Sequence, residues 1–402
     1  MVGRGGQKRS SAAALVALVM LVSCVQHQPV TPPPSPVAPA PPERFGVAEI
    51  ARMIPSRIPD REGWARDLLA SLKAHDLRPT LQNVASILAV IEQESGFQAN
   101  PTVPGLAKLV EKQLNDYASK LGPLGPPTVR ALLEARVPGT PTTFRTRLQQ
   151  ARTERDLDRL FRELLRYYET GFPKTFAAAN LLGGLISSTR LEDFNPITTA
   201  GCMQVSVRFA HEQAKKEGKS LLEVRDALYT RRGGLHYGVA RLLGYDAGYK
   251  LPLYRFADYN AGLYASRNAA LQDQLARLTG LELVPDGDLL AYNRQGDPLP
   301  DETRSLHAML AFREKYAPTL SEAQLRRDVQ KEKTLSLEHT DTWRALKAAY
   351  ERVTGQHPSY ARLPEVTLRS PKLSAERSTA WFARSVDKRY QALLQRKRTP
   401  KS

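Results

Sequence analysis

The sequence predicts a mainly α-helical protein. From residue 44 onward, apolar side chains recur at helical spacing nearly everywhere, and the alternation typical of strands is scarce. The pattern is clearest in two stretches. One apolar face comprises Leu106, Leu109, Val110, Leu114, Tyr117 and Leu121, and another comprises Leu157, Leu160, Phe161, Leu164, Leu165 and Tyr168. Such faces are typical of helices that pack against a core.

The chain's 402 residues, 42% of them apolar, suffice for a substantial core. Glycine and proline predict turns at Gly122–Pro127 and Val137–Pro141. A last helix is predicted by the helical spacing of Phe382, Val386, Tyr390 and Leu393, and the basic run Arg396–Arg398 follows it.

The first residues predict an export signal. Arg4, Lys8 and Arg9 precede an apolar run, Ala12–Val22, that is too short to span a bilayer as a stable helix. The run ends at Leu21–Cys24, which resembles the lipobox of bacterial lipoproteins, so we expect Cys24 to carry lipid. Val25, rather than aspartate, follows the cysteine, which resembles the pattern that sorts lipoproteins of Gram-negative bacteria to the outer membrane. We therefore expect the chain at the periplasmic face of that membrane. An ordinary cleaved signal or a short membrane anchor is the alternative.

A linker is predicted after this signal. Residues 29–42 contain eight prolines and favour an extended, polyproline-like chain that rises about 3 Å per residue. Such a segment would hold a domain some distance from a lipid surface.

The charge predicts an anionic partner. Without residues 1–23 the chain keeps 55 basic and 41 acidic residues, a net charge of +14. No pattern typical of nucleic-acid binding is present, so we expect no nucleic acid. Peptidoglycan, whose peptides carry carboxylates, or anionic lipid fits an exported protein better, and a solvated basic surface is the alternative.

Little in the sequence predicts a metal or a cofactor. Cys202 is the only cysteine besides Cys24, so an intrachain disulfide is not expected once Cys24 is acylated. The seven histidines are scattered singly, without a metal-binding motif.

The segment Val84–Phe97 carries the strongest sign of chemistry. Ile87, Val90, Ile91 and Glu94 share one helix face, and Glu92 points elsewhere. Gly96 predicts the helix end. Burial and the negative end of the helix dipole would both favour the protonated form of Glu94, as a general acid requires. From the residues of this segment alone, a partly buried acid paired with one of the many arginines is the favoured interpretation.

Three motifs in order resemble those of the soluble lytic transglycosylases, which share their fold with goose-type lysozyme. They are Glu94-Ser95 with Phe97, Gly201–Val205 and Tyr259–Gly262. Two weaker matches are Arg232–Leu235, followed by Leu242 and Leu243, and Leu299–Arg304. The resemblance covers about two fifths of the chain.

The resemblance implies a lysozyme-like helical domain that cleaves the β-1,4 bond between N-acetylmuramic acid and N-acetylglucosamine and leaves a 1,6-anhydro end. It assigns Glu94 as the single catalytic carboxyl, which Ser95 helps to orient. Met203 and Gln204 would line the sugar cleft, Tyr259 would lean toward the carboxyl, and Asn260 would support the cleft wall. Read from the residues alone, Met203 is core filler and Tyr259 is a half-buried packing residue.

The chain departs from the family in spacing. Some ninety residues are inserted between the first two motifs, and Cys202, Asp258 and Leu306 replace other residue types. The predicted organisation is a signal (1–23), a lipidated cysteine and linker (24–43), a lysozyme-like domain in two parts (44–100 and 194–316), a helical insertion (101–193) and a helical C-terminal extension (317–402). The insertion is a candidate for binding a protein partner.

Two other functions remain open. In a hydrolase like goose-type lysozyme, Glu192, Asp193 or Asp258 would be a second carboxylate that activates water. In a non-catalytic lipoprotein for wall binding or assembly, the domain would serve as a scaffold.

Overall fold

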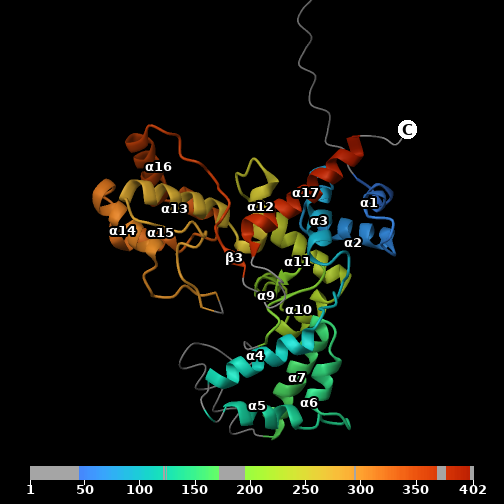
Figure 1. Ribbon diagram of the computed structural model, residues 1–402. Coiled ribbons are helices and arrows are strands. Elements are labelled where there is room, and N and C mark those ends of the chain that lie inside the picture. Colours follow the sequence, from blue (N-terminus) through green and yellow to red (C-terminus); the bar gives the residue numbers. More distant parts are fainter. Residues whose placement is uncertain are drawn as a thin grey trace, which may run out of the picture. The chain divides into compact units, whose positions relative to one another are not determined.

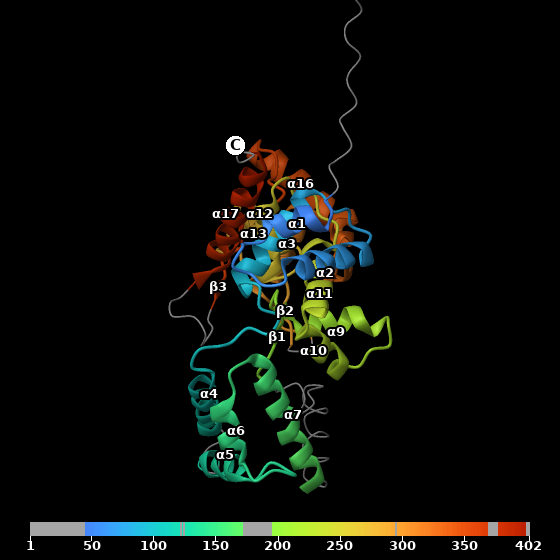
Figure 2. The same cartoon turned by 90° about the vertical axis from the view of Figure 1, so that its right-hand side faces the viewer.

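The computed structural model describes residues 45–120, 123, 125–171, 195–293, 296–368 and 377–398. The chain divides after Pro42, and all described residues belong to the part from Glu43 onward. Regular structure there is almost entirely helical (Figures 1 and 2), so the predicted mainly α fold class is confirmed. None of the described helices combines the length and the apolar character that crossing a membrane would demand. The predicted signal, Cys24 and the proline-rich linker lie outside the described residues.

The elements follow one another as short and medium helices. The first are α1 (Val47–Met53), α2 (Arg61–Ala74), α3 (Leu81–Glu94), α4 (Leu106–Lys120), α5 (Gly125–Glu134), α6 (Phe144–Gln150) and α7 (Glu154–Gly171). Then come α9 (Val207–Lys215), α10 (Leu221–Leu228), α11 (Arg231–Leu243), α12 (Pro252–Ala261), α13 (Ala265–Thr279) and α14 (Arg304–Tyr316). The last are α15 (Glu322–Val329), the 3-10 helix η2 (Leu335–His339), α16 (Asp341–Thr354) and α17 (Thr379–Arg398). Two antiparallel pairs join β1 (Thr199–Ala200) to β2 (Val205–Ser206) and β3 (Thr367–Leu368) to β4 (Arg377–Ser378).

Several helices begin where the sequence offers a polar cap. The side-chain oxygen of the capping residue accepts a hydrogen bond from the backbone N–H three residues on, which satisfies a donor that the helix leaves open. Such caps are Thr80, Ser206, Ser220, Thr230 and Thr303.

The two predicted turns have different outcomes. The turn at Val137–Pro141 is confirmed, because Thr140 N–H bonds the Val137 carbonyl and Gly139 has a φ of 73°. The turn at Gly122–Pro127 is wrong for its last three residues, since α5 begins at Gly125. Pro126 and Pro127 fit there because the first turn of a helix leaves its N–H groups unpaired anyway.

The buried side chains form two cores. The first core is built from α1–α7, α9–α12 and α17. The second core is built from α13–α16 and the loop at 281–293. Both predicted apolar faces contribute to the first core, through Leu106 and Val110 on α4 and through Leu157 and Leu160 on α7.

The helix α17 brings residues from late in the chain to the first core. It lies beside α3 and α12 (Figure 1). Its four predicted apolar residues, Phe382, Val386, Tyr390 and Leu393, are all buried, so this helix prediction is confirmed. The Ser385 hydroxyl donates to Gln93 Oε1 at 2.9 Å, and Gln93 is the residue before Glu94. α17 therefore supports the end of the helix that carries the candidate acid.

Candidate active site

Glu94 is the last residue of α3 and is partly exposed, whereas every residue from Val84 to Ile91 is buried. The sequence predicted one apolar face on this helix. The structure buries the helix on all sides, because α11 and α17 both pack against it. The carboxyl of Glu94 thus lies where a fully buried helix reaches the surface.

The chain turns sharply after Glu94. Ser95 N–H donates to the Ile91 carbonyl at 3.0 Å, and its hydroxyl donates to the same carbonyl at 3.1 Å and accepts from Gln98 N–H at 3.3 Å. Gly96 and Phe97 follow with φ values of 58° and 67°. The helix end predicted at Gly96 is therefore confirmed. The bonds of Ser95 fix the turn beside the carboxyl.

The second motif forms the tight connection between β1 and β2. Gly201 has a φ of 83°, and a Cβ there would lie 2.2 Å from the Leu228 carbonyl oxygen, so only glycine fits. Gln204 N–H closes the turn on the Gly201 carbonyl at 3.0 Å, and Gln204 itself has a φ of 48°. The backbone thereby holds Gln204 in one place.

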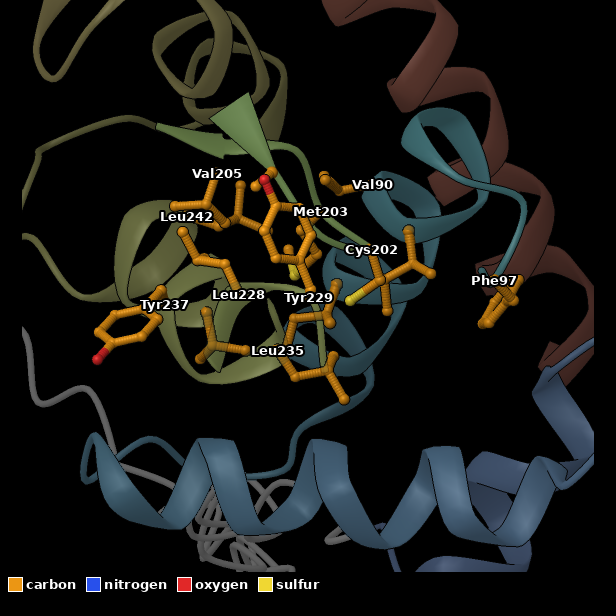
Figure 3. Close-up of a cluster of buried hydrophobic side chains, with 14 of the residues drawn as sticks. Val90, Phe97, Cys202, Met203, Val205, Leu228, Tyr229, Leu235, Tyr237 and Leu242 are labelled. Carbon is orange, nitrogen blue, oxygen red and sulfur yellow. The ribbon is translucent and has the colours of Figure 1, made fainter. Parts of the chain in front are cut away.

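Glycines on α11 let that helix touch the second motif directly. A Cβ at Gly234 would lie 2.9 Å from Cys202 Sγ, and one at Gly238 would lie 2.2 Å from Met203 Sδ. Figure 3 shows Cys202 and Met203 among apolar side chains that include Leu235 of this helix. Both sulfur side chains are fully buried, and burial raises the pKa of the Cys202 thiol to about 12. Cys202 and Met203 therefore serve as packing residues.

The Tyr259 hydroxyl of the third motif contacts the second motif and lies within the electrostatic influence of Glu94. Tyr259 is buried, and its hydroxyl donates to the Met203 carbonyl at 2.7 Å. Burial raises the pKa of Tyr259 well above its ordinary value, and the nearby charge of Glu94 raises it further, against an opposing effect of Arg241. Glu94, Met203 and Tyr259, which the sequence placed in one site, thus lie close together.

Gln204 has partners that the sequence did not predict. Its Nε2 donates to Glu154 Oε2 at 3.0 Å and to the Gly201 carbonyl at 3.3 Å. Its Oε1 accepts from the Thr199 hydroxyl at 3.1 Å. Glu154 is the first residue of α7 and only 1% exposed. A helix of the predicted insertion therefore supplies a carboxylate to the second motif.

One turn further along α7, Asp158 ties the same helix to its surroundings. Asp158 is fully buried and accepts from Asn195 Nδ2 at 2.6 Å and from Arg225 Nη1 at 3.0 Å. Arg162 forms a further ion pair with it. Arg225 also donates to the Ile197 carbonyl at 3.0 Å, and burial lowers its pKa. A buried ion-pair network thus fixes α7 against α10 and the segment that leads into β1.

A simple signal would have found both acids. Glu154, Leu157, Asp158 and Phe161 recur at the spacing of one helix face. Acids on an apolar face are the same pattern that singled out Glu94. The sequence analysis used the apolar residues of this stretch and passed over the carboxylates.

The remaining predicted site residues that the structure describes bond to other parts of the protein. Asn260 Oδ1 accepts from the Thr379 hydroxyl of α17 at 2.9 Å. Asp258 is fully buried and accepts from Tyr249, Tyr245 and Ser266, and burial raises its pKa. Water therefore has no access to this carboxyl. Glu192 and Asp193 lie outside the described residues.

Comparison with known proteins places the chain among relatives whose function is not established. No solved structure matches it. It is 35% identical, over 383 residues, to "Uncharacterized protein YaiW" of Escherichia coli strain K12, an alignment that covers 94% of this chain and 96% of the relative. A family model described as "Protein of unknown function (DUF1615)", rather than one of the lytic transglycosylases, matches residues 57–396. The chain therefore belongs to the DUF1615 family.

Proposed function

We propose that this protein is a peptidoglycan lytic transglycosylase with a lysozyme-like catalytic domain and Glu94 as its acid and base. The observation that carries the proposal is the hydrogen bond from the Tyr259 hydroxyl to the Met203 carbonyl, close enough to Glu94 for its charge to raise the pKa of Tyr259. These groups come from α3, the β1–β2 connection and α12, which lie far apart in the sequence. They are also the segments whose motifs resemble that enzyme family.

One carboxyl is enough for this reaction. Glu94 protonates the bridging oxygen of the β-1,4 bond while the N-acetyl oxygen of the muramic acid attacks its own C1. Glu94, now ionised, then takes the proton from the O6 hydroxyl. O6 attacks C1, the bond between C1 and the N-acetyl oxygen breaks, and the 1,6-anhydro ring closes without consuming water. The substrate thus supplies the group that most glycosidases take from a second carboxylate.

Tyr259 suits this mechanism because it stays neutral. Its raised pKa keeps the phenol protonated, and its proton is committed to the Met203 carbonyl. Tyr259 therefore adds no second negative charge beside Glu94, and it holds the β1–β2 connection in place next to the acid. Asn260 and Ser95 support the same site through α17 and through the turn after α3.

The proposed location is the periplasmic face of the outer membrane, with the chain anchored through lipid on Cys24. There the excess of basic residues would attract the protein to the carboxylates of peptidoglycan peptides. Labelling of the wild type and of Cys24→Ala with a palmitate analogue tests the anchor. Label on both variants would contradict it.

Digestion of purified sacculi tests the activity. We expect the protein lacking residues 1–23 to release muropeptides that are lighter by one water than hydrolysed ones, as mass spectrometry detects. Glu94→Gln should lose about 10²- to 10⁴-fold in rate with an unchanged melting temperature. Glu92→Gln is the matched control, because Glu92 lies on the same helix end but pairs with Arg57.

Three outcomes would contradict the proposal in different ways. Products that contain the added water would indicate a hydrolase. Binding to sacculi without released fragments would indicate a wall-binding protein. Equal loss of rate in Glu94→Gln and Glu92→Gln would remove Glu94 from the chemistry.

A further inference from the structure

We propose that Glu154 is a positioning residue that fixes the carboxamide of Gln204 so that Gln204 offers the glycan a hydrogen-bond acceptor and no donor. The inference rests on the proposed function and names what the glycan must present at this position. The matching group is an uncharged donor, such as the acetamido N–H of an N-acetylated sugar or a sugar hydroxyl. Glu154 would act only through Gln204.

The chemistry of the two side chains fixes the orientation. An ionised carboxylate can only accept hydrogen bonds, so the amide group that faces Glu154 must be the NH2 group of Gln204. Glu154 is the first residue of α7, where the positive end of the helix dipole stabilises a negative charge. The two oxygen–nitrogen assignments of Gln204 are therefore not equivalent here.

Counting the bonds of Gln204 shows what remains for a ligand. Both N–H donors of Nε2 are used, one by Glu154 and one by the Gly201 carbonyl. Oε1 has two lone pairs, and the Thr199 hydroxyl takes one. Gln204 is partly exposed between the fully buried Met203 and Val205. Among the described residues, one acceptor position on Oε1 is therefore left.

The support behind Glu154 is rigid. Asp158, on the next turn of α7, is bound by Arg225 and Asn195. Arg225 also holds the Ile197 carbonyl, two residues before Thr199. Thr199 donates to Gln204 Oε1 and Glu154 accepts from Gln204 Nε2. The segments that carry these two residues are thus held by one buried network. α7 therefore belongs to the site although it lies in the segment predicted as an insertion.

The test uses Glu154→Gln, which keeps the shape but can bond either end of the Gln204 amide, so that only the 3.3 Å bond to the Gly201 carbonyl still favours the original orientation. The flipped amide would present NH2 to the glycan, so KM for soluble glycan strands should rise about tenfold while kcat changes by less than about twofold. The matched control is Glu163→Gln, on the same helix, where the carboxylate pairs with Arg147. A purely structural role for Glu154 would instead lower the melting temperature and leave KM unchanged.

A double-mutant cycle tests whether Glu154 acts through Gln204. In a Gln204→Met background, which has the length of glutamine but no amide, Glu154→Gln should not raise KM further. A full tenfold increase in that background would overturn the inference. So would an unchanged KM in the single variant.

Binding separates this inference from the proposed function. In a Glu94→Gln background, sedimentation with sacculi gives the affinity without cleavage, and we expect Glu154→Gln to weaken it by the same factor. If the wild type binds but does not cut, the proposed activity fails, and the effect of Glu154→Gln on binding still tests the role of Glu154. If the wild type neither binds nor cuts, both proposals fail.

Discussion

The second core and the candidate active site both hold polar groups in place by hydrogen bonds, but they differ in how far those groups are exposed. In the second core, fully buried Arg267 donates to Asn268, to Glu338 and to the backbone carbonyls of Glu332 and Thr334. The Glu332 carboxylate, also fully buried, accepts from Asn268, from Tyr292 and from two backbone N–H groups. Internal partners use the bonding capacity of both groups.

The groups of the candidate site are more exposed. Glu94 is partly exposed at the end of a buried helix, and Gln204 keeps one acceptor position. Asp258, by contrast, resembles the buried groups of the second core, because two tyrosine hydroxyls and a backbone N–H donate to its carboxylate. The comparison teaches that a fully buried charge with internal partners indicates a structural role, whereas a partly exposed polar group with an open acceptor position indicates a site for a ligand.

The largest effect that would break the comparison is expected at Arg267. Arg267→Leu removes the positive charge that pairs with Glu338 and takes away the donor of the Thr334 carbonyl, so it should lower the free energy of unfolding by about 3 to 5 kcal/mol. The rate of glycan cleavage per folded molecule should not change. Urea unfolding followed by circular dichroism measures the loss, and exposed Arg277→Leu, on the same helix, should stay within about 0.5 kcal/mol of the wild type. A loss below about 1 kcal/mol would show that the network contributes little.

A smaller effect should sharpen the comparison at α11. The Cβ that Gly238→Ala adds would lie 2.2 Å from Met203 Sδ and 2.8 Å from Met203 Cβ. The β1–β2 connection must therefore shift. We expect a loss of about 1 to 3 kcal/mol in stability. The folded fraction should also lose cleavage activity, because the Met203 carbonyl and Gln204 move with the connection. Gly171→Ala, which has open space around it, is the control. Full activity in folded Gly238→Ala would separate the connection from the chemistry.

The smallest effect concerns pH and the histidine pair between α2 and α11. The rings of His75 and His236 lie 4.5 Å apart, and burial, with the charge of His75, lowers the pKa of His236 below its usual 6.5. The neutral form is thus favoured in the folded state, so its contribution to stability is present above pH 6.5 and is lost as pH falls through the lowered pKa. His236→Gln should lose less stability than the wild type between pH 6.5 and 5. Melting temperatures measured at several pH values check this, and parallel curves would contradict it.

Local signals predicted much of the helical fold. The spacing of apolar residues found α4, α7 and α17, and the end of α3 followed from Gly96. The start of α5 was missed because proline is common both in turns and in the first turn of a helix. These errors and successes all concern residues that are neighbours in the sequence.

Partners distant in the sequence could not be predicted. Glu154 meets Gln204 fifty residues later, and Arg267 meets Glu338 seventy-one residues later. His75 and His236, which look isolated in the sequence, have their rings 4.5 Å apart and tilted by 32°. Only the fold brings such groups together. The motifs of Glu94, Met203 and Tyr259 were placed in one site by resemblance to a family, and their spacing alone would not have joined them.

The packing of α17 on α3 has a consequence for how the protein is made. The hydroxyl that supports Gln93 comes from Ser385, 292 residues later in the chain. During synthesis, α3 lacks this support until residues 379–398 have left the ribosome and folded back. The proposed catalytic site would therefore stay incomplete until nearly the whole chain has been synthesised and folded.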